Sequence, residues 1–256
     1  MFYAFWRTVI VVTARLLFGV RTRGAEHLPR SGVYILAPSH RSTLDIPFSA
    51  SVTRRRLRFM AKSQIFNGVF WTWVFDELGA VPVDRDGSDR AALQAIESAL
   101  RAGEPVVVFP EGTRRSGPAL GPIYSGAAYL AYRVGVPLVP VGIGGSEYPF
   151  RRWFGVPGFS RVTVVVGEPF TPEKVDGDKR RDAVARADAE LLARMQACFD
   201  EAVEWSDHRS RHGRITAKAR SAKARWAAAD RASARPPGAG GRSGSVPGSG
   251  EAGEGG

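Results

Sequence analysis

The residues best suited to acid–base chemistry are His40 and Asp45, which are separated by four residues and follow the apolar run 33–37. A neutral imidazole can accept a proton from a substrate hydroxyl only if one of its ring nitrogens is free. A carboxylate that holds the other ring N–H fixes this tautomer. The spacing therefore predicts that Asp45 accepts a hydrogen bond from Nδ1–H of His40, and that Nε2 of His40 faces the substrate.

The same segment also matches a purely structural pattern. Ser42 and Asp45 are spaced like the two ends of a helix capping box, in which the acidic side chain only satisfies main-chain N–H groups at the start of a helix over 44–51. We expect that a single carboxylate can hardly serve both the main chain and His40 fully. On the residues alone, the catalytic and the capping interpretations of Asp45 both stay open.

A second polar cluster, Glu111, Gly112, Thr113 and Arg114, follows the β-branched run 105–109, which has the composition of a buried strand. A glycine lets the main chain approach a ligand, an arginine offers planar donors to phosphate, and a carboxylate accepts hydroxyl or guanidinium donors. This combination suits a small phosphorylated polyol. The alternative is an ordinary polar loop in which Glu111 pairs with a neighbouring arginine.

The elements that must position these clusters alternate along the chain. Runs typical of strands cover 33–37, 80–83, 105–109, 136–142 and 161–166, and a short strand is expected within the arginine-rich segment 54–62. Helical patterns cover 44–51, 65–78, 92–100, 125–134 and 178–205. This alternation predicts a single α/β domain with a largely parallel or mixed central sheet flanked by helices. His40, Arg85 and Arg114 each follow a strand, so we expect them at one edge of the sheet, where ligands bind in open α/β folds.

The first twenty residues are apolar and aromatic but are interrupted by Arg7 and Arg15. A spanning helix needs about 20 predominantly apolar residues, and a signal peptide needs a small-residue cleavage site; neither pattern precedes 21–23. We expect an amphipathic membrane-binding helix over 1–20, although a helix packed on the protein's own core fits the same pattern. The aromatic segment 65–78 likewise fits either an acyl-chain groove or the hydrophobic core.

Composition bounds the domain plan. The chain has 256 residues, 44% of them hydrophobic, which is enough for one sizeable core. Its net charge is +11, of which +6 comes from ten lysines and arginines against four acidic residues from Asp207 to the C-terminus. We expect a folded domain over 21–205 and a disordered basic tail, rich in Ala, Gly and Pro, over 206–256.

The basic charge suits nucleic acid, anionic lipid or phosphorylated substrates. The tail has Trp226 as its only aromatic residue and lacks a stacking platform, so we expect no nucleic-acid partner and favour the membrane. Cys198 is the only cysteine, and no cluster of His, Cys and carboxylates has metal-ligand spacing. We therefore expect neither a disulfide within the chain nor a metal.

Four segments, taken together, carry a family resemblance. They are Ser-His-Arg-Ser-Thr-Leu-Asp (39–45), Val-Pro-Val-Asp-Arg (81–85), Phe-Pro-Glu-Gly-Thr-Arg (109–114) and Val-Pro-Leu-Val-Pro-Val (136–141). In this order they resemble the four blocks of the glycerolipid acyltransferase family, which includes 1-acylglycerol-3-phosphate acyltransferases. The resemblance covers roughly residues 20 to 170. Ser39 departs from the asparagine that commonly precedes the family's histidine, and 123–126 lacks a basic residue often found there.

The resemblance implies a role for each matching residue. His40 is the general base and Asp45 its orienting partner. The residues implied in binding the glycerol phosphate are Arg85, Glu111, Gly112, Thr113 and Arg114, with Arg115 as an additional cation. Pro140 is implied to shape the pocket for the acyl donor.

The implied reaction transfers a fatty acyl group from acyl-CoA or acyl-carrier protein, as co-substrate, to the sn-2 hydroxyl of a lysophosphatidic acid. No other cofactor is implied, and the product is phosphatidic acid for phospholipid biosynthesis. We expect a peripheral protein at the cytoplasmic face of the cell membrane. Two alternatives stay open: an acyltransferase that acts on a different lipid or glycolipid hydroxyl, and a catalytically silent membrane-binding protein.

Overall fold

The computed structural model describes residues 2–63, 66–83, 89–147, 150–153, 156–159, 161–175 and 179–209. Its centre is a seven-stranded sheet in the order β1-β9-β6-β2-β5-β3-β4. The strands are β1 (Arg21–Arg23), β2 (Ile35–Pro38), β3 (Arg58–Lys62), β4 (Ala80–Val83), β5 (Val106–Val107), β6 (Leu138–Gly144) and β9 (Thr163–Val166). Neighbouring strands are parallel except β6 and β9, which confirms the predicted α/β fold with a mixed sheet.

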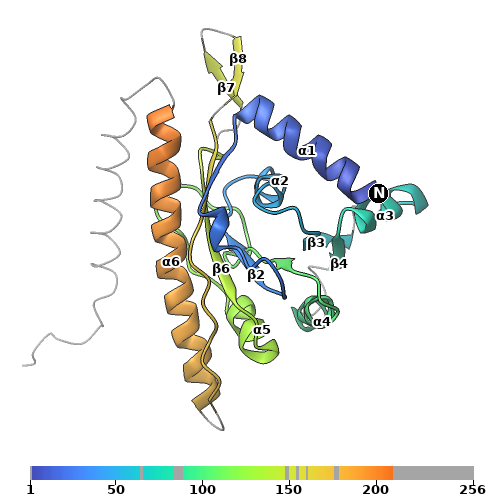
Figure 1. Ribbon diagram of the computed structural model, residues 1–256, viewed down its shortest axis with the longest axis vertical. Helices are drawn as coiled ribbons and strands as arrows, with labels where there is room; N and C mark the ends of the chain where they lie inside the picture. Colours follow the sequence, from blue (N-terminus) through green and yellow to red (C-terminus); the bar gives the residue numbers. More distant parts are fainter. Residues whose placement is uncertain are drawn as a thin grey trace, which may run out of the picture.

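Helices cover both faces of this sheet (Figure 1). They are α1 (Phe2–Phe18), α2 (Asp45–Ala50), α3 (Val69–Glu77), α4 (Asp89–Arg101), α5 (Gly126–Val134) and α6 (Arg180–Arg209), with a short 3-10 helix η1 (Ala25–His27). Two further strands, β7 (Phe150–Trp153) and β8 (Val156–Phe159), pair with each other outside the main sheet. Helix α6 runs along β6 and β9, and α1 and α2 lie on the opposite side of the sheet.

Strand β2 shows why the apolar run 33–37 does not alternate between apolar and polar residues. Ile35 and Ala37 face the core beneath α4, α5 and α6, while Leu36 faces the core beneath α1 and α2. All three side chains are fully buried. A strand covered on both faces needs apolar residues at every position, and this fixes β2 at the centre of the domain.

The contact between α6 and β6 depends on two glycines of the strand. A Cβ atom at Gly142 would lie 2.1 Å from the carbonyl carbon of Cys198, and one at Gly144 would lie 2.3 Å from that of Ala202. No side chain fits in that space. The main chain of α6 therefore rests directly on the strand.

Helix α1 has two apolar sides. Val11, Ala14 and Phe18 are buried against the domain, whereas the other side exposes Phe5, Trp6, Val9, Val12, Leu16 and Leu17. The helix therefore packs on the protein's own core through one stripe and leaves a second apolar stripe in solvent. Among the described residues, none of the helices combines the length and the hydropathy that crossing a bilayer requires.

Helix α3 differs from the expectation of a core helix. Val69 is 90% exposed, Phe70 63% and Trp73 48%. Because these side chains project outward, assigning them to the hydrophobic core is wrong. The helix lies near the N-terminal end of α1 (Figure 1).

Candidate active site

The hydrogen bond that the spacing of His40 and Asp45 predicts is present. Nδ1 of His40 lies 3.1 Å from Oδ2 of Asp45. The His40 side chain is 15% exposed and that of Asp45 is fully buried. A carboxylate acceptor at Nδ1 places the proton on that nitrogen and leaves Nε2 as a free acceptor, which is the tautomer a general base needs.

Asp45 serves the main chain as well as the imidazole. Its Oδ2 accepts hydrogen bonds from the main-chain N–H groups of Arg41 at 2.5 Å and Ser42 at 2.6 Å. The Ser42 contact is the carboxylate half of a capping box, although α2 begins only at Asp45. The expectation that one carboxylate can hardly serve both roles is wrong, because a single oxygen accepts from the imidazole and from two main-chain donors.

Two neighbours fix the rest of the His40 environment. The ring of Phe109 lies with its centroid 4.2 Å from that of the imidazole. Oγ of Ser39 is buried and accepts from the main-chain N–H of Ile143 at 3.0 Å, which ties the end of β2 to β6. Ser39 therefore has a structural role in holding the strand end from which His40 projects.

Glu111 is fully buried, and both its oxygens accept main-chain donors. Oε1 accepts from the N–H of His40 at 3.0 Å, and Oε2 accepts from the N–H of Gly121 at 3.1 Å. No ion pair joins Glu111 to an arginine among the described residues, so the alternative of an ordinary loop held by a Glu111–arginine pair is wrong. The carboxylate instead links the loop that carries His40 to the loop after β5.

Gly112, Thr113 and Arg114 are exposed on that second loop. Nη1 of Arg114 donates to Oγ1 of Thr43 at 2.9 Å, so this cation lies against the loop that carries His40 and Asp45. Gly112 has a φ of 64°, and a Cβ there would lie 2.7 Å from the ring of Tyr124. The positive φ favours glycine, whereas the exposed Tyr124 ring could move to admit a side chain.

Two of the expected site residues, Pro140 and Arg85, are not among these contacts. Pro140 is buried within β6, opposite Ala37 in the register, and its carbonyl accepts from Gly167 at 2.9 Å. Arg85 falls outside the described residues, so its position relative to His40 stays a prediction. The structure thus brings together His40, Asp45 and Glu111, with Arg114 at the rim.

Arg41 is a residue near the site that we did not single out. It is 6% exposed, its Nη2 donates to the carbonyl of Ala119 at 2.8 Å, and its guanidinium lies 4.6 Å from the ring centroid of Phe199 in α6. A buried cation over an aromatic face is a stabilising arrangement. Its place inside the 39–45 segment is the only sequence signal that points to it.

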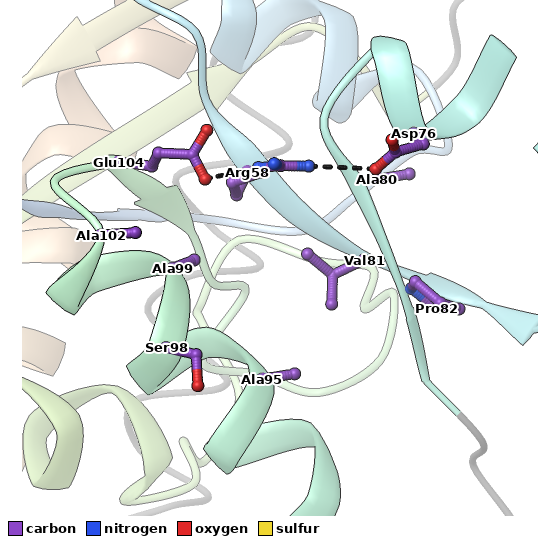
Figure 2. Close-up of a pocket in the computed structure, with 10 residues that line it drawn as sticks. All are labelled: Arg58, Asp76, Ala80, Val81, Pro82, Ala95, Ser98, Ala99, Ala102 and Glu104. Atoms are coloured by element: carbon purple, nitrogen blue, oxygen red, sulfur yellow. Dashed lines mark hydrogen bonds and ion pairs between the residues drawn. The ribbon is translucent and has the colours of Figure 1, made fainter. Parts of the chain in front are cut away.

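A cavity of about 360 Å³ lies away from these residues (Figure 2). It is lined by Arg58, Asp76 and Glu104 and by small residues of α4 and β4. Arg58 and Glu104 lie at the beginnings of parallel strands β3 and β5, whereas His40 follows the end of β2, so the cavity and His40 lie toward opposite edges of the sheet. Substrates of open α/β folds bind at the carboxyl edge, which favours the His40 region.

Arg58, which lines this cavity, is paired with two carboxylates. Nε of Arg58 donates to Glu104 at 2.8 Å, and its Nη1 donates to Asp76 at 3.3 Å. Burial alone lowers the pKa of Arg58, but these two carboxylates raise it above its ordinary value. Within the part of the chain that the structure describes, no three His, Cys, Asp or Glu side chains gather in a way that could hold a metal ion.

Comparison with known proteins identifies relatives of this chain. A family model described as Acyltransferase matches residues 19–144. A 1-acyl-sn-glycerol-3-phosphate acyltransferase of Bacillus subtilis is 26% identical over 65% of this chain and 81% of its own length. One from Pseudomonas aeruginosa is 29% identical over 77% of this chain and 74% of its own length.

The fold has a solved counterpart. The crystal structure of the 1-acyl-sn-glycerophosphate acyltransferase PlsC from Thermotoga maritima aligns with a TM-score of 0.59 and 22% identity, covering 81% of each chain. At that identity the alignment concerns the fold. The family model and the named relatives show that residues 19–144 of this chain form an acyltransferase domain, in agreement with the ordered sequence blocks.

Proposed function

We propose that this enzyme transfers an acyl group from acyl-CoA or acyl-carrier protein to the sn-2 hydroxyl of 1-acyl-glycerol-3-phosphate, giving phosphatidic acid for phospholipid biosynthesis. The observation that carries the proposal is the hydrogen bond between Arg114 and Thr43. It puts an exposed guanidinium, suited to a phosphate, against the same loop as the general base. The names of the relatives support the same acceptor.

The reaction follows from the geometry of His40. Nε2 removes the proton of the acceptor hydroxyl while its oxygen attacks the thioester carbonyl carbon. The tetrahedral intermediate then collapses, the C–S bond breaks, and the departing thiolate takes the proton from the imidazolium. Asp45 stabilises that imidazolium, because its buried carboxylate is already 3.1 Å from Nδ1.

The test uses the purified full chain with labelled oleoyl-CoA and oleoyl-acyl-carrier protein, each offered with a panel of acceptors. The panel contains lysophosphatidic acid, lysophosphatidylcholine, monoacylglycerol and a glycolipid, and products are identified by mass spectrometry. We expect phosphatidic acid as the main product. A main product formed on an acceptor without a phosphomonoester would overturn the proposed acceptor, and vesicle binding with no transfer to any acceptor would favour a silent membrane-binding protein.

We further propose that the enzyme works as a peripheral protein at the cytoplasmic face of the cell membrane, with the exposed stripe of α1 and the exposed face of α3 in the headgroup region. Leu16 is 76% exposed and Phe70 63%, and Arg15 and Arg54 are exposed cations on or near these helices. Apolar contact together with attraction to anionic lipid is the usual basis of interfacial binding.

Flotation with anionic vesicles tests this attachment. Leu16→Glu places a charge in the exposed stripe and is expected to weaken binding strongly. Thr8→Glu is the matched control, because it adds the same charge on an exposed position about 80° around the helix. Equal loss in both variants would indicate a pure charge effect and would contradict insertion of the stripe.

A further inference from the structure

The main chain of His40 is held on both sides by the loop after β5. Its N–H donates to Glu111 at 3.0 Å, and its carbonyl accepts from the N–H of Arg115 at 2.9 Å. Neither bond comes from the strand that precedes His40. The position of the imidazole therefore depends on the position of that loop.

The loop is in turn held by side chains along five consecutive residues, 117–121, which we name the clasped segment. Its main-chain N–H groups at Gly117 and Leu120 donate to Glu147 and to Gln196, each at 2.8 Å. The remaining contacts of the segment are Gln196 Nε2 to the carbonyl of Pro118 at 3.4 Å, Arg41 Nη2 to the carbonyl of Ala119 at 2.8 Å, and the N–H of Gly121 to Glu111 at 3.1 Å. Ordering these side chains costs conformational entropy, and the hydrogen bonds that they form hold the loop in one conformation.

Gln196 holds the clasped segment from the long C-terminal helix, outside the four sequence blocks. It lies on α6, it is half-buried, and its amide both accepts from Leu120 and donates to Asp200 Oδ1 at 2.8 Å. A continuous series of hydrogen bonds thus runs from α6 through the clasped segment and Glu111 to the N–H of His40. Gln196 and the clasped segment both lie outside the four family blocks, whereas Glu111 and His40 lie within them.

We infer that Gln196 is a positioning residue of the acyl-transfer site, which fixes His40 through the clasped segment, and that Glu111 acts in the same chain of contacts rather than on the substrate. This inference rests on the proposed function for its kinetic consequence. A misplacement of about 1 Å at a reacting group can cost about 100-fold in rate. Removing one contact of several is expected to cost less.

The kinetic test compares Gln196→Ala with Glu190→Ala, which removes an exposed side chain from the same helix. We expect Gln196→Ala to lower kcat about 10-fold, with KM for donor and acceptor changed less than about threefold, and Glu190→Ala to change neither. A merely stabilising role would instead lower the melting temperature and leave kcat per folded enzyme at the wild-type value. That result would overturn the inference.

Rescue by an exchanged pair sharpens the test. Gln196→Glu sets a second carboxylate beside Asp200 and is expected to be at least as impaired as the alanine variant. Adding Asp200→Asn restores this hydrogen bond with its direction reversed, because the amide NH₂ group at position 200 donates to the carboxylate at position 196. That carboxylate still accepts from the main-chain N–H of Leu120. The carbonyl of Pro118 stays without its donor, because the carboxylate has no NH₂ group. The double variant is therefore expected to recover part of kcat, and a double variant no better than Gln196→Glu would contradict the assigned contact with residue 200.

Hydrogen exchange measured without substrate separates this inference from the proposed function. In Gln196→Ala, the amides of Leu120, Gly121 and His40 are expected to exchange faster, with the rest of the sheet unchanged. If wild-type protein fails to acylate lysophosphatidic acid but the exchange result holds, the proposed acceptor falls and the positioning role stands. If wild-type protein is active and the variant matches it in exchange and in kcat, the positioning role falls.

Discussion

The two edges of the sheet hold their buried and half-buried charges in different ways. At the edge that carries His40, the carboxylates of Asp45 and Glu111 are fully buried and accept mainly main-chain N–H groups. At the other edge, Glu104 and Asp76 pair with the half-buried Arg58 beside a cavity. Ion pairs near the surface contribute little and tolerate movement, whereas main-chain donors fix a carboxylate in one place. On the proposed function, the site lies with the carboxylates that main-chain donors hold in place and not at the cavity.

The largest expected effect comes from His40→Ala. Loss of the general base is expected to lower kcat about 1,000-fold or more, because no other group takes its place next to Asp45. The measurement is transfer from a labelled thioester, with circular dichroism to verify the fold. If His40→Ala keeps its turnover within about tenfold of the wild-type value, His40 is not the general base, and the edge that carries it is no better a candidate for the site than the edge that carries Arg58.

Asp45→Asn is expected to lower kcat by about 100-fold or more. The amide oxygen can still accept from the main chain, but the neutral group no longer stabilises an imidazolium or favours the required tautomer. Asp188→Asn is the matched control, since burial raises the pKa of this half-buried α6 carboxyl and it lies outside the site. Equal losses in both variants would indicate a general effect of removing a carboxylate.

Arg114→Ala is expected to raise KM for lysophosphatidic acid about tenfold and to change kcat less. The guanidinium is exposed, and a single charge-assisted contact with phosphate is worth about 1.5–3 kcal/mol. Arg114→Lys keeps the charge but not the planar donors and is expected to recover part of the affinity. A larger effect on kcat than on KM would instead place Arg114 with the positioning contacts.

The smallest effects concern stability and compare the two edges directly. Glu111→Gln is expected to lower the free energy of unfolding by about 1–3 kcal/mol, because its new NH₂ group must face a main-chain donor. Glu104→Gln is expected to lower it by less than about 1 kcal/mol and to leave kcat unchanged. Urea unfolding of both variants measures the free energy of unfolding. Equal losses in the two variants would contradict the difference between the two edges.

The fold was largely predictable because the central strands are buried on both faces. The apolar runs at 33–37 and 136–142 form strands β2 and β6, which are buried on both faces, whereas the apolar run at 80–83 forms β4 at the edge of the sheet, where Pro82 is exposed. Strand β1, with the sequence Arg-Thr-Arg, has no such signal, because its pairing with β9 comes from the main chain. The sequence of β9 likewise gives no sign that it runs antiparallel to β6 and parallel to β1.

The sequence predicts those contacts of the site in which one side chain bonds to another side chain. The contact between His40 and Asp45 has a sequence spacing, whereas the contacts of Glu111 with Gly121 and of Gln196 with Leu120 end on main-chain groups that any residue supplies. Such contacts leave no pattern to detect. Gln196 in particular resembles an ordinary polar residue on the outer face of a long helix.

The two glycines of β6 set how closely α6 approaches the sheet, and this has a use in protein engineering. Gly142 and Gly144 meet the helix at Cys198 and Ala202, within two turns of Gln196. A methyl group at either position must push the helix outward, and the hydrogen bond from Leu120 to Gln196 would lengthen with it. Alanine substitution at these positions therefore offers a way to disturb the site from inside the core without altering any group that touches the substrate, and a loss of stability accompanies it because the clash is with the main chain of the helix.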